Sequence, residues 1–273
     1  MKKKKQGKAA IALITISILF LGFMLIVPLI AVIVYAMRDG LGAYIASITD
    51  EYTIKALKLT LLATVIAVFI NTLFGLFAAW VITKYRYQGK QLLKTLIDIP
   101  FAISPVIAGL IFIMTFGRIG WAYDLIHSMD IKIVFAVPGV ILATVFVTFP
   151  FVSREIIPVL EAAGTDEEEA AALMGASGFT IFRTITLPQI KWALLYGIIL
   201  CTARAMGEFG AVSVLSGHLR GKTNTLPLHV EILYNEFKLE EAFAVSSILM
   251  ILAIIILILR NIVEYRGKKE RGI

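Results

Sequence analysis

The sequence predicts an all-α integral membrane protein with six transmembrane helices, for three reasons. First, 59% of its 273 residues are hydrophobic and 16% are charged, which leaves too little polar surface for a water-soluble domain. Second, the hydrophobic residues form blocks of about 18 residues or more, enough to cross a hydrocarbon core of about 30 Å. Third, the lysines and arginines lie mainly between these blocks. The net charge of +7 therefore reflects membrane topology and predicts no nucleic-acid partner.

The six predicted spans are Ala9–Met37, Leu59–Val81, Ile97–Gly117, Val134–Val152, Trp192–Leu215 and Ala242–Leu259. The first span follows Lys2–Lys5 and so looks like the start of a signal peptide. It is too long for a cleaved hydrophobic region and no clean cleavage site follows it, so we expect an uncleaved span. In the second span, Asn71 predicts a hydrogen bond between helices. Pro100 and Pro105 interrupt the third span, as either a static kink or a functional hinge.

The distribution of positive charge predicts that both termini lie in the cytoplasm. With this orientation the inner segments carry 17 lysines and arginines and the outer segments carry 8, as the positive-inside rule requires. The three tryptophans fall at predicted span ends, where aromatic side chains meet the membrane surface. We therefore expect Ser128 and Asn224 to be accessible from outside the cell and Gly164 from the cytoplasm.

The longest polar segment lies between the fourth and fifth spans and predicts two short helices joined by a bend. Asp166–Met174 consists of helix-forming residues with acidic side chains at its start, where negative charge is favourable. Gly175 permits a turn that a residue with a Cβ would resist. A second helical stretch, Gly178–Thr186, is expected to end at Pro188, because proline cannot continue a helix. An ordinary amphipathic loop would give much of the same pattern.

This segment also carries a spaced motif, Glu-Ala-Ala-x3-Gly-x9-Ile-x-Leu-Pro. Its fixed positions are Glu169, Ala170, Ala171, Gly175, Ile185, Leu187 and Pro188. The motif resembles the EAA loop of the membrane subunits of binding-protein-dependent ABC importers. The resemblance implies a type-1 (MetI-like) permease fold in which this loop binds a separate ATPase. The chain has no G-x4-G-K-[ST] phosphate-binding pattern, so we expect ATP on partner subunits and no cofactor on this chain.

Four further segments narrow the resemblance to the oxyanion permeases. They are Asp98–Leu110, Phe149–Glu155, Arg204–Val214 and Ser216–Leu228. The Gly-Glu-Phe-Gly core of the third segment is shared across the oxyanion permeases, and the segment that begins at Ser216 is similar to CysW-type sulfate/thiosulfate permease subunits in particular. The family implies an ATP-driven sulfate importer in the cytoplasmic (inner) membrane, with thiosulfate also accepted. The other parts of the importer would be a CysT-type second permease, two ATPase subunits and an extracytoplasmic binding protein. The spans of this chain would also contact membrane lipid. A molybdate or tungstate permease, a secondary anion transporter without an ATPase and a non-transporting scaffold stay open as alternatives.

The resemblance covers roughly residues 57–264 and implies a division into three parts. Residues 1–56 form an N-terminal cytoplasmic tail, the first transmembrane helix and an outer loop. Residues 57–264 form the ABC type-1 transmembrane permease domain, and residues 265–273 form a cytoplasmic C-terminal tail.

Few ionisable residues lie inside the predicted spans. Arg204 and Glu208 are four residues apart on the fifth span and are expected to share a helix face. Unpaired charges near the bilayer centre are costly, so the pair should point into the protein, either as a structural contact or lining a translocation pathway with Pro100 and Pro105.

Outside the spans, Arg220 and Lys222 lie on a predicted outer loop rich in glycine and threonine. They would form a positive mouth for an anion, or else dock the binding protein or face solvent. The spans hold no paired catalytic set, so we expect a transport subunit rather than an enzyme. The single cysteine, Cys201, and the three histidines lack metal-ligand spacing, so we expect no metal site.

Overall fold

The computed structural model describes residues 8–270, and this part of the chain consists of helices and turns without a β-strand. The long helices are α1 (Lys8–Ala36), α3 (Glu51–Lys84), α7 (Val137–Thr148) followed by α8 (Pro150–Ala163), α11 (Leu187–Met206) and α14 (Leu239–Glu270). Five helical segments are long and apolar enough to cross a membrane, and a bent pair of shorter helices would make a sixth. The predicted all-α membrane fold is confirmed.

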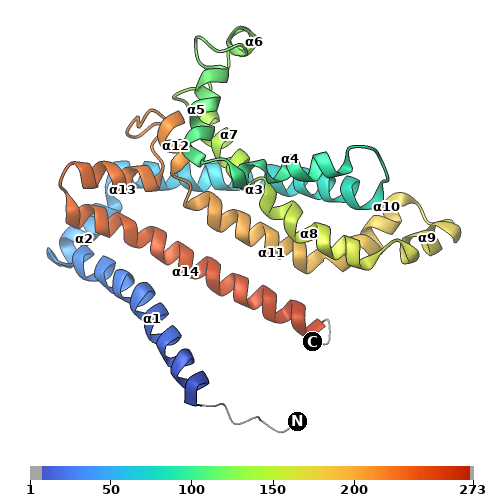
Figure 1. Ribbon diagram of the computed structural model, residues 1–273. Coiled ribbons are helices and arrows are strands. Elements are labelled where there is room, and N and C mark those ends of the chain that lie inside the picture. Colours follow the sequence, from blue (N-terminus) through green and yellow to red (C-terminus); the bar gives the residue numbers. More distant parts are fainter. Residues whose placement is uncertain (1–7, 271–273) are drawn as a thin grey trace.

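The short helices gather at the two ends of the long ones (Figure 1). At one end, here called the α13 end, lie α2 (Gly40–Thr49), α12 (Gly210–Leu215) and α13 (Leu226–Asn235). At the other, the α9 end, lie α9 (Asp166–Leu173), α10 (Gly178–Ile181) and a π-helical turn, η1 (Phe182–Thr186). The remaining elements are α4 (Lys90–Ala102), α5 (Pro105–Phe116) and α6 (Tyr123–Ser128), and α5 and α6 project from the body of the protein (Figure 1).

Helix α3 is the centre of the packing. It contacts α7, α8, α11 and α13, and each of the three buried hydrophobic clusters contains one of its alanines: Ala56, Ala63 or Ala79. Small buried side chains let the neighbouring backbones approach closely, which is the main source of helix association in a membrane. Gly75 illustrates this close approach, because a Cβ there would lie 3.1 Å from the Cβ of Val152 in α8.

Asn71 forms the hydrogen bond between helices that the sequence predicts. Its side-chain amide is fully buried and donates to Thr148 Oγ1 at 2.8 Å and to the carbonyl oxygen of Val145 at 3.1 Å. Both acceptors lie on α7, so this one side chain ties α7 to the central helix.

The third predicted span, Ile97–Gly117, is interrupted, as its prolines predict, and consists of parts of two helices. The chain bends by 107° between α4 and α5. Pro100 lies inside α4 without breaking it, whereas Pro105 is the first residue of α5. The break falls at Ser104 (φ −58°, ψ 132°), because the residue before a proline is pushed out of the helical region.

The fifth predicted span is also too long at its C-terminal end. Helix α11 stops at Met206 rather than at Leu215, and Gly207 is followed by a separate short helix, α12. The other predicted spans correspond to α1, α3, α7–α8 and α14, although the observed helices are shifted or extend further. The domain boundaries expected at 56/57 and 264/265 fall inside α3 and α14.

Candidate functional site

The polar segment before α11 folds as a short helix and a tight turn, as the sequence predicts. Gly175 has a φ of +86°, and the amides of Gly175 and Ala176 donate back to the carbonyls of Ala172 and Ala171 at 3.0 Å each. These bonds close the C-terminal end of α9 around a left-handed residue, a conformation that glycine adopts without steric cost. Residues 165–189, with α9, Gly175, α10 and η1, are called the coupling loop below, after the role that the resemblance in the sequence implies for them.

The predicted end of the second loop helix at Pro188 is wrong. The chain is helical from Gly178 to Met206, and Pro188 is the second residue of α11. The π-helical turn η1 comes directly before it, with the Leu187 amide donating to the carbonyl of Phe182. A widened turn accommodates the missing N–H and the bulk of the proline ring. The coupling loop therefore runs without interruption into a membrane span.

The motif residues divide between the inside and the outside of the coupling loop. Ala171 is buried, Ile185 and Leu187 are half-buried, and Glu169, Ala170 and Pro188 are exposed. Around them lie three large apolar side chains that the sequence analysis did not single out: Leu173, Met174 and Phe179 are 90%, 83% and 74% exposed. We call these three residues the docking face. In the sequence, these large apolar residues lie on both sides of Gly175 within a polar segment, and this pattern could have identified them.

Glu168 attaches the coupling loop to the rest of the protein. One carboxylate oxygen lies 2.9 Å from Nζ of Lys84, the last residue of α3, and the other accepts the hydroxyl of Thr186 at 2.5 Å. Lys84 also donates to the carbonyl of Gly164 at 2.8 Å. Glu169, which belongs to the motif, makes only a local contact with the Thr165 hydroxyl at 2.8 Å.

Arg204 and Glu208 meet as predicted, but for a different reason. Arg204 Nη1 lies 2.6 Å from Glu208 Oε2, and their side chains are 33% and 1% exposed. The helix has ended before Glu208, so the two residues do not share a helix face. Glu208 instead reaches back to Arg204 while its other oxygen accepts the Ala211 amide at 3.0 Å. This carboxylate therefore satisfies a backbone donor at the start of α12 and a cation at the end of α11.

The broken third span packs beside this pair. A Cβ on Gly210 would lie 2.8 Å from Pro105 Cβ, and one on Gly109 would lie 2.7 Å from the carbonyl oxygen of Ala211. Helices α5 and α12 are therefore in close contact. Of the predicted pathway residues, the fold brings Pro105 against Gly210, two residues after Glu208. Pro100 is buried in α4, which packs on α7 and α8.

At the α13 end, the two predicted cations differ in their surroundings. Arg220 lies 2.9 Å from Glu236, and its guanidinium sits over the ring of Tyr52 at 5.6 Å. Lys222 is exposed. Because Glu236 compensates the charge of Arg220, Lys222 is the predicted cation of this loop that would still attract an anion.

The loop before α13 is held by buried polar contacts. The Leu226 amide donates to Thr60 Oγ1 at 2.7 Å, and His229 Nε2 lies 3.2 Å from Thr53 Oγ1. Burial lowers the pKa of His229, which favours the neutral ring at physiological pH. Asn224 is buried as well, so the expectation that it is accessible from outside is wrong.

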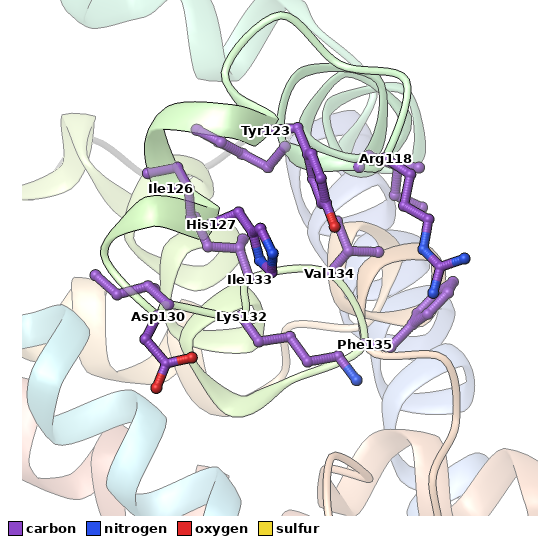
Figure 2. A pocket seen from close by; sticks show the side chains of 13 residues that line it. Arg118, Tyr123, Ile126, His127, Asp130, Lys132, Ile133, Val134 and Phe135 are labelled. Atoms are coloured by element: carbon purple, nitrogen blue, oxygen red, sulfur yellow. The ribbon is translucent and has the colours of Figure 1, made fainter.

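A pocket of about 610 Å³ lies where α5 ends and α6 turns back towards α7. In Figure 2, Arg118 and Lys132 extend towards Phe135, and Asp130 lies on the opposite side of the pocket. His127 stacks on Tyr123 with ring centres 5.2 Å apart. Ile119 and Trp121, in the adjoining turn, are almost fully exposed. The sequence analysis counted Arg118 and Lys132 only as outer charges and missed the pocket.

Comparison with known proteins gives consistent results along the whole chain. Residues 71–269 match the family described as binding-protein-dependent transport system inner membrane component. The sulfate transport system permease protein CysW of Synechococcus elongatus is 48% identical over 98% of this chain and 94% of its own length. The CysT protein of Salmonella typhimurium, also named as a sulfate transport system permease, is 34% identical over 94% of this chain and 93% of its own.

A solved structure shares the fold. One chain of a bacterial alginate ABC transporter, crystallised with an alginate pentasaccharide-bound periplasmic protein, superposes with a TM-score of 0.76. It covers 94% of this chain and 93% of its own length, at 16% sequence identity. At that identity the similarity establishes the fold and carries no information on substrate.

The Arg204–Glu208 pair gives a prediction about stability. Replacing Arg204 by methionine leaves a buried carboxylate without its cation and should lower the free energy of unfolding by about 2 kcal/mol. The loss is smaller than the loss for a fully buried ion pair, because Arg204 is partly exposed. The double substitution Arg204→Met with Glu208→Gln removes both charges and keeps an acceptor for the Ala211 amide. It should therefore recover most of the loss in thermal unfolding of the detergent-solubilised protein. Equal stability of the single and double variants would show that charge pairing does not hold α12 in place.

Proposed function

This chain belongs to the family of binding-protein-dependent transport system inner membrane components, and from that premise we propose that it is the CysW-type permease subunit of an ATP-driven sulfate importer. The observation that carries the proposal is the near full-length similarity to a CysW sulfate permease, clearly greater than the similarity to CysT. Thiosulfate, a tetrahedral dianion of similar size, is the second proposed substrate. A molybdate or tungstate permease and a secondary anion transporter are the alternatives that the experiments below distinguish.

The coupling loop supports the assignment of an ATPase partner. Its docking face exposes three large apolar side chains at the tip of a segment that continues into α11. Exposed apolar patches of this kind, beside the small side chains of Ala170 and Ala172, are typical of protein interaction sites. We assign this face to an ATPase subunit, with Glu169, Ala170, Ala171, Gly175, Ile185, Leu187 and Pro188 shaping the loop behind it.

The remaining parts of the transporter follow from the same proposal. A CysT-type permease would form the other half of the membrane channel, and two ATPase subunits would serve the two permeases. The projecting α5–α6 arm, with its pocket and the exposed Ile119 and Trp121, suits contact with an extracytoplasmic sulfate-binding protein. The permease domain would run from Glu51, where α3 begins, to Glu270, where α14 ends, so that no helix is divided between domains.

The proposed pathway lies next to the Arg204–Glu208 pair. Two spans are interrupted there, at Ser104–Pro105 and at Gly207. Within a membrane, such breaks occur where the backbone lines a cavity or is buried in protein. The permease would use Arg204, released from Glu208, as the cation that a passing dianion contacts.

The substrate assignment is tested by sulfate uptake. In a strain without other sulfate importers, deletion of this gene should abolish uptake of radiolabelled sulfate and growth on sulfate, while growth on cysteine is unchanged. Normal growth on sulfate would contradict the assignment. Loss of molybdoenzyme activity instead would favour the molybdate permease, and uptake that survives ATP depletion and follows an ion gradient would favour the secondary transporter.

The coupling loop is tested at Gly175. Valine at this position should weaken ATPase binding about tenfold, since a left-handed backbone costs a non-glycine residue about 1–2 kcal/mol. The strain would come from the backbone alone, because nothing lies within 4 Å of an added Cβ. Gly178→Val is the matched control, with equally open space and no positive φ. Retention of the ATPase by Gly175→Val, measured by co-purification, would show that the turn does not shape the docking face.

The orientation is tested by cysteine labelling in a Cys201→Ser background. Ser128→Cys and Lys222→Cys, both exposed, should react with an impermeant maleimide in intact cells. Lys222 replaces the buried Asn224 in this test. Ala162→Cys, exposed near the end of α8, should react only after permeabilisation, and it replaces Gly164, whose φ is +70°. The reverse pattern would place both termini outside.

A further inference from the structure

Glu168 is the point where three segments of the α9 end meet. Its two oxygens bind Lys84 of α3 and Thr186 of η1, and Lys84 in turn binds the Gly164 carbonyl between α8 and α9. The side chains of Lys84 and Glu168 are only 8% and 15% exposed, and Thr186 is fully buried. Every polar atom that forms this junction has a partner, which is the condition for a low-dielectric ion pair to hold a fixed geometry.

The helix dipoles reinforce this junction. Lys84 is the last residue of α3, where the carbonyl ends of the helix favour a cation, and Glu168 lies in the first turn of α9, where the amide ends favour an anion. The pair therefore joins the C-terminal end of the central span to the N-terminal end of the loop helix. A second contact parallels it, since the rings of Trp80 in α3 and Phe182 in η1 lie 5.1 Å apart.

The far end of α3 is equally well attached. Thr60 accepts the Leu226 amide that begins α13, and Thr53 contacts His229. Helix α3 is continuous over its 34 residues, so these contacts and Lys84 lie on one unbroken helix. Movement of its inner end would therefore be carried to the α13 end of the protein.

We propose that Lys84 and Glu168 are the positioning residues through which movement of the coupling loop reaches the membrane spans. When an ATPase displaces α9, Glu168 moves α3 through Lys84 and moves α11 through Thr186, so that two spans respond together. Neither residue belongs to the docking face, and neither is part of the Glu-Ala-Ala-x3-Gly motif. This inference rests on the proposed function, because it assigns a role within ATP-driven transport.

The same region contains a matched control pair. Lys94 of α4 and Glu161 of α8 lie 2.6 Å apart and are 29% and 45% exposed. This pair does not involve the coupling loop, and surface pairs of this type contribute little to stability. Loss of coupling specific to Lys84 and Glu168 would therefore distinguish transmission from a general effect of removing an ion pair.

The experiment uses the complete transporter with its ATPase, assayed for radiolabelled sulfate uptake, ATP hydrolysis and co-purification of the ATPase. In Lys84→Met and in Glu168→Gln, the sulfate transported per ATP hydrolysed should fall about tenfold, the range of a typical coupling free energy between sites. The ATPase should remain bound, since the docking face is intact. Lys84→Arg, which keeps the charge and the donors, should retain most of the coupling, and Lys94→Met should behave as the unmodified protein.

Each other result overturns the inference. Unchanged sulfate transport per ATP in Lys84→Met and Glu168→Gln would exclude a role in transmission. Loss of the bound ATPase in both would make the pair part of the docking site, and an equal effect of Lys94→Met would make it a general structural contact. If the Lys84→Met complex assembles poorly, Glu168→Gln is the deciding variant. This substitution keeps the size of the side chain and an acceptor for Thr186. If the unmodified complex binds no ATPase or takes up no sulfate, the proposed function itself fails.

Discussion

Close backbone approach along α3 is the constraint on which the rest of the structure depends. Inside a membrane, burial of apolar side chains gives little driving force, because lipid tails are as apolar as leucine. Helices associate where small side chains allow dense packing and where polar groups find partners. Helix α3 offers both, with buried alanines in all three hydrophobic clusters, Gly75 against Val152, and Asn71 bonded to α7. A larger residue at Gly75 would separate α3 from α8 and weaken the contacts that follow from it.

The interrupted spans are compatible with a membrane because neighbouring groups satisfy part of the backbone at each break. A helix break frees backbone donors and acceptors, and these are costly in hydrocarbon unless protein or water satisfies them. At the break after Met206, the Glu208 carboxylate accepts the Ala211 amide and pairs with Arg204. At the break before Pro105, the first turn of α5 packs against Gly210. Each break therefore supplies part of the surroundings of the other.

The two ends of the protein use charge differently. At the α13 end, the Arg220–Glu236 ion pair and the His218–Glu231 contact are partly exposed and hold surface loops in place. At the α9 end, Lys84 and Glu168 are mostly buried, while the large apolar side chains of the docking face are exposed. This inversion of the usual distribution fits a segment that is fixed to the spans on one side and open to a partner protein on the other.

The sequence by itself determined the class of the fold and much of its local structure. Hydropathy identified the apolar segments, Asn71 predicted a contact between helices, and Gly175 predicted a tight turn, because each of these depends on the chemistry of one residue or one continuous segment. Only the tertiary structure decided where helices break and which charges are free. Proline alone does not decide the outcome, because the chain breaks before Pro105, which packs against Gly210 of α12, but continues as a helix through Pro188 by means of a π-helical turn. In the same way, Arg220 is neutralised by Glu236 and Glu168 is bound by Lys84 because folding brings residues 16 and 84 positions apart into contact, and no local pattern encodes that proximity.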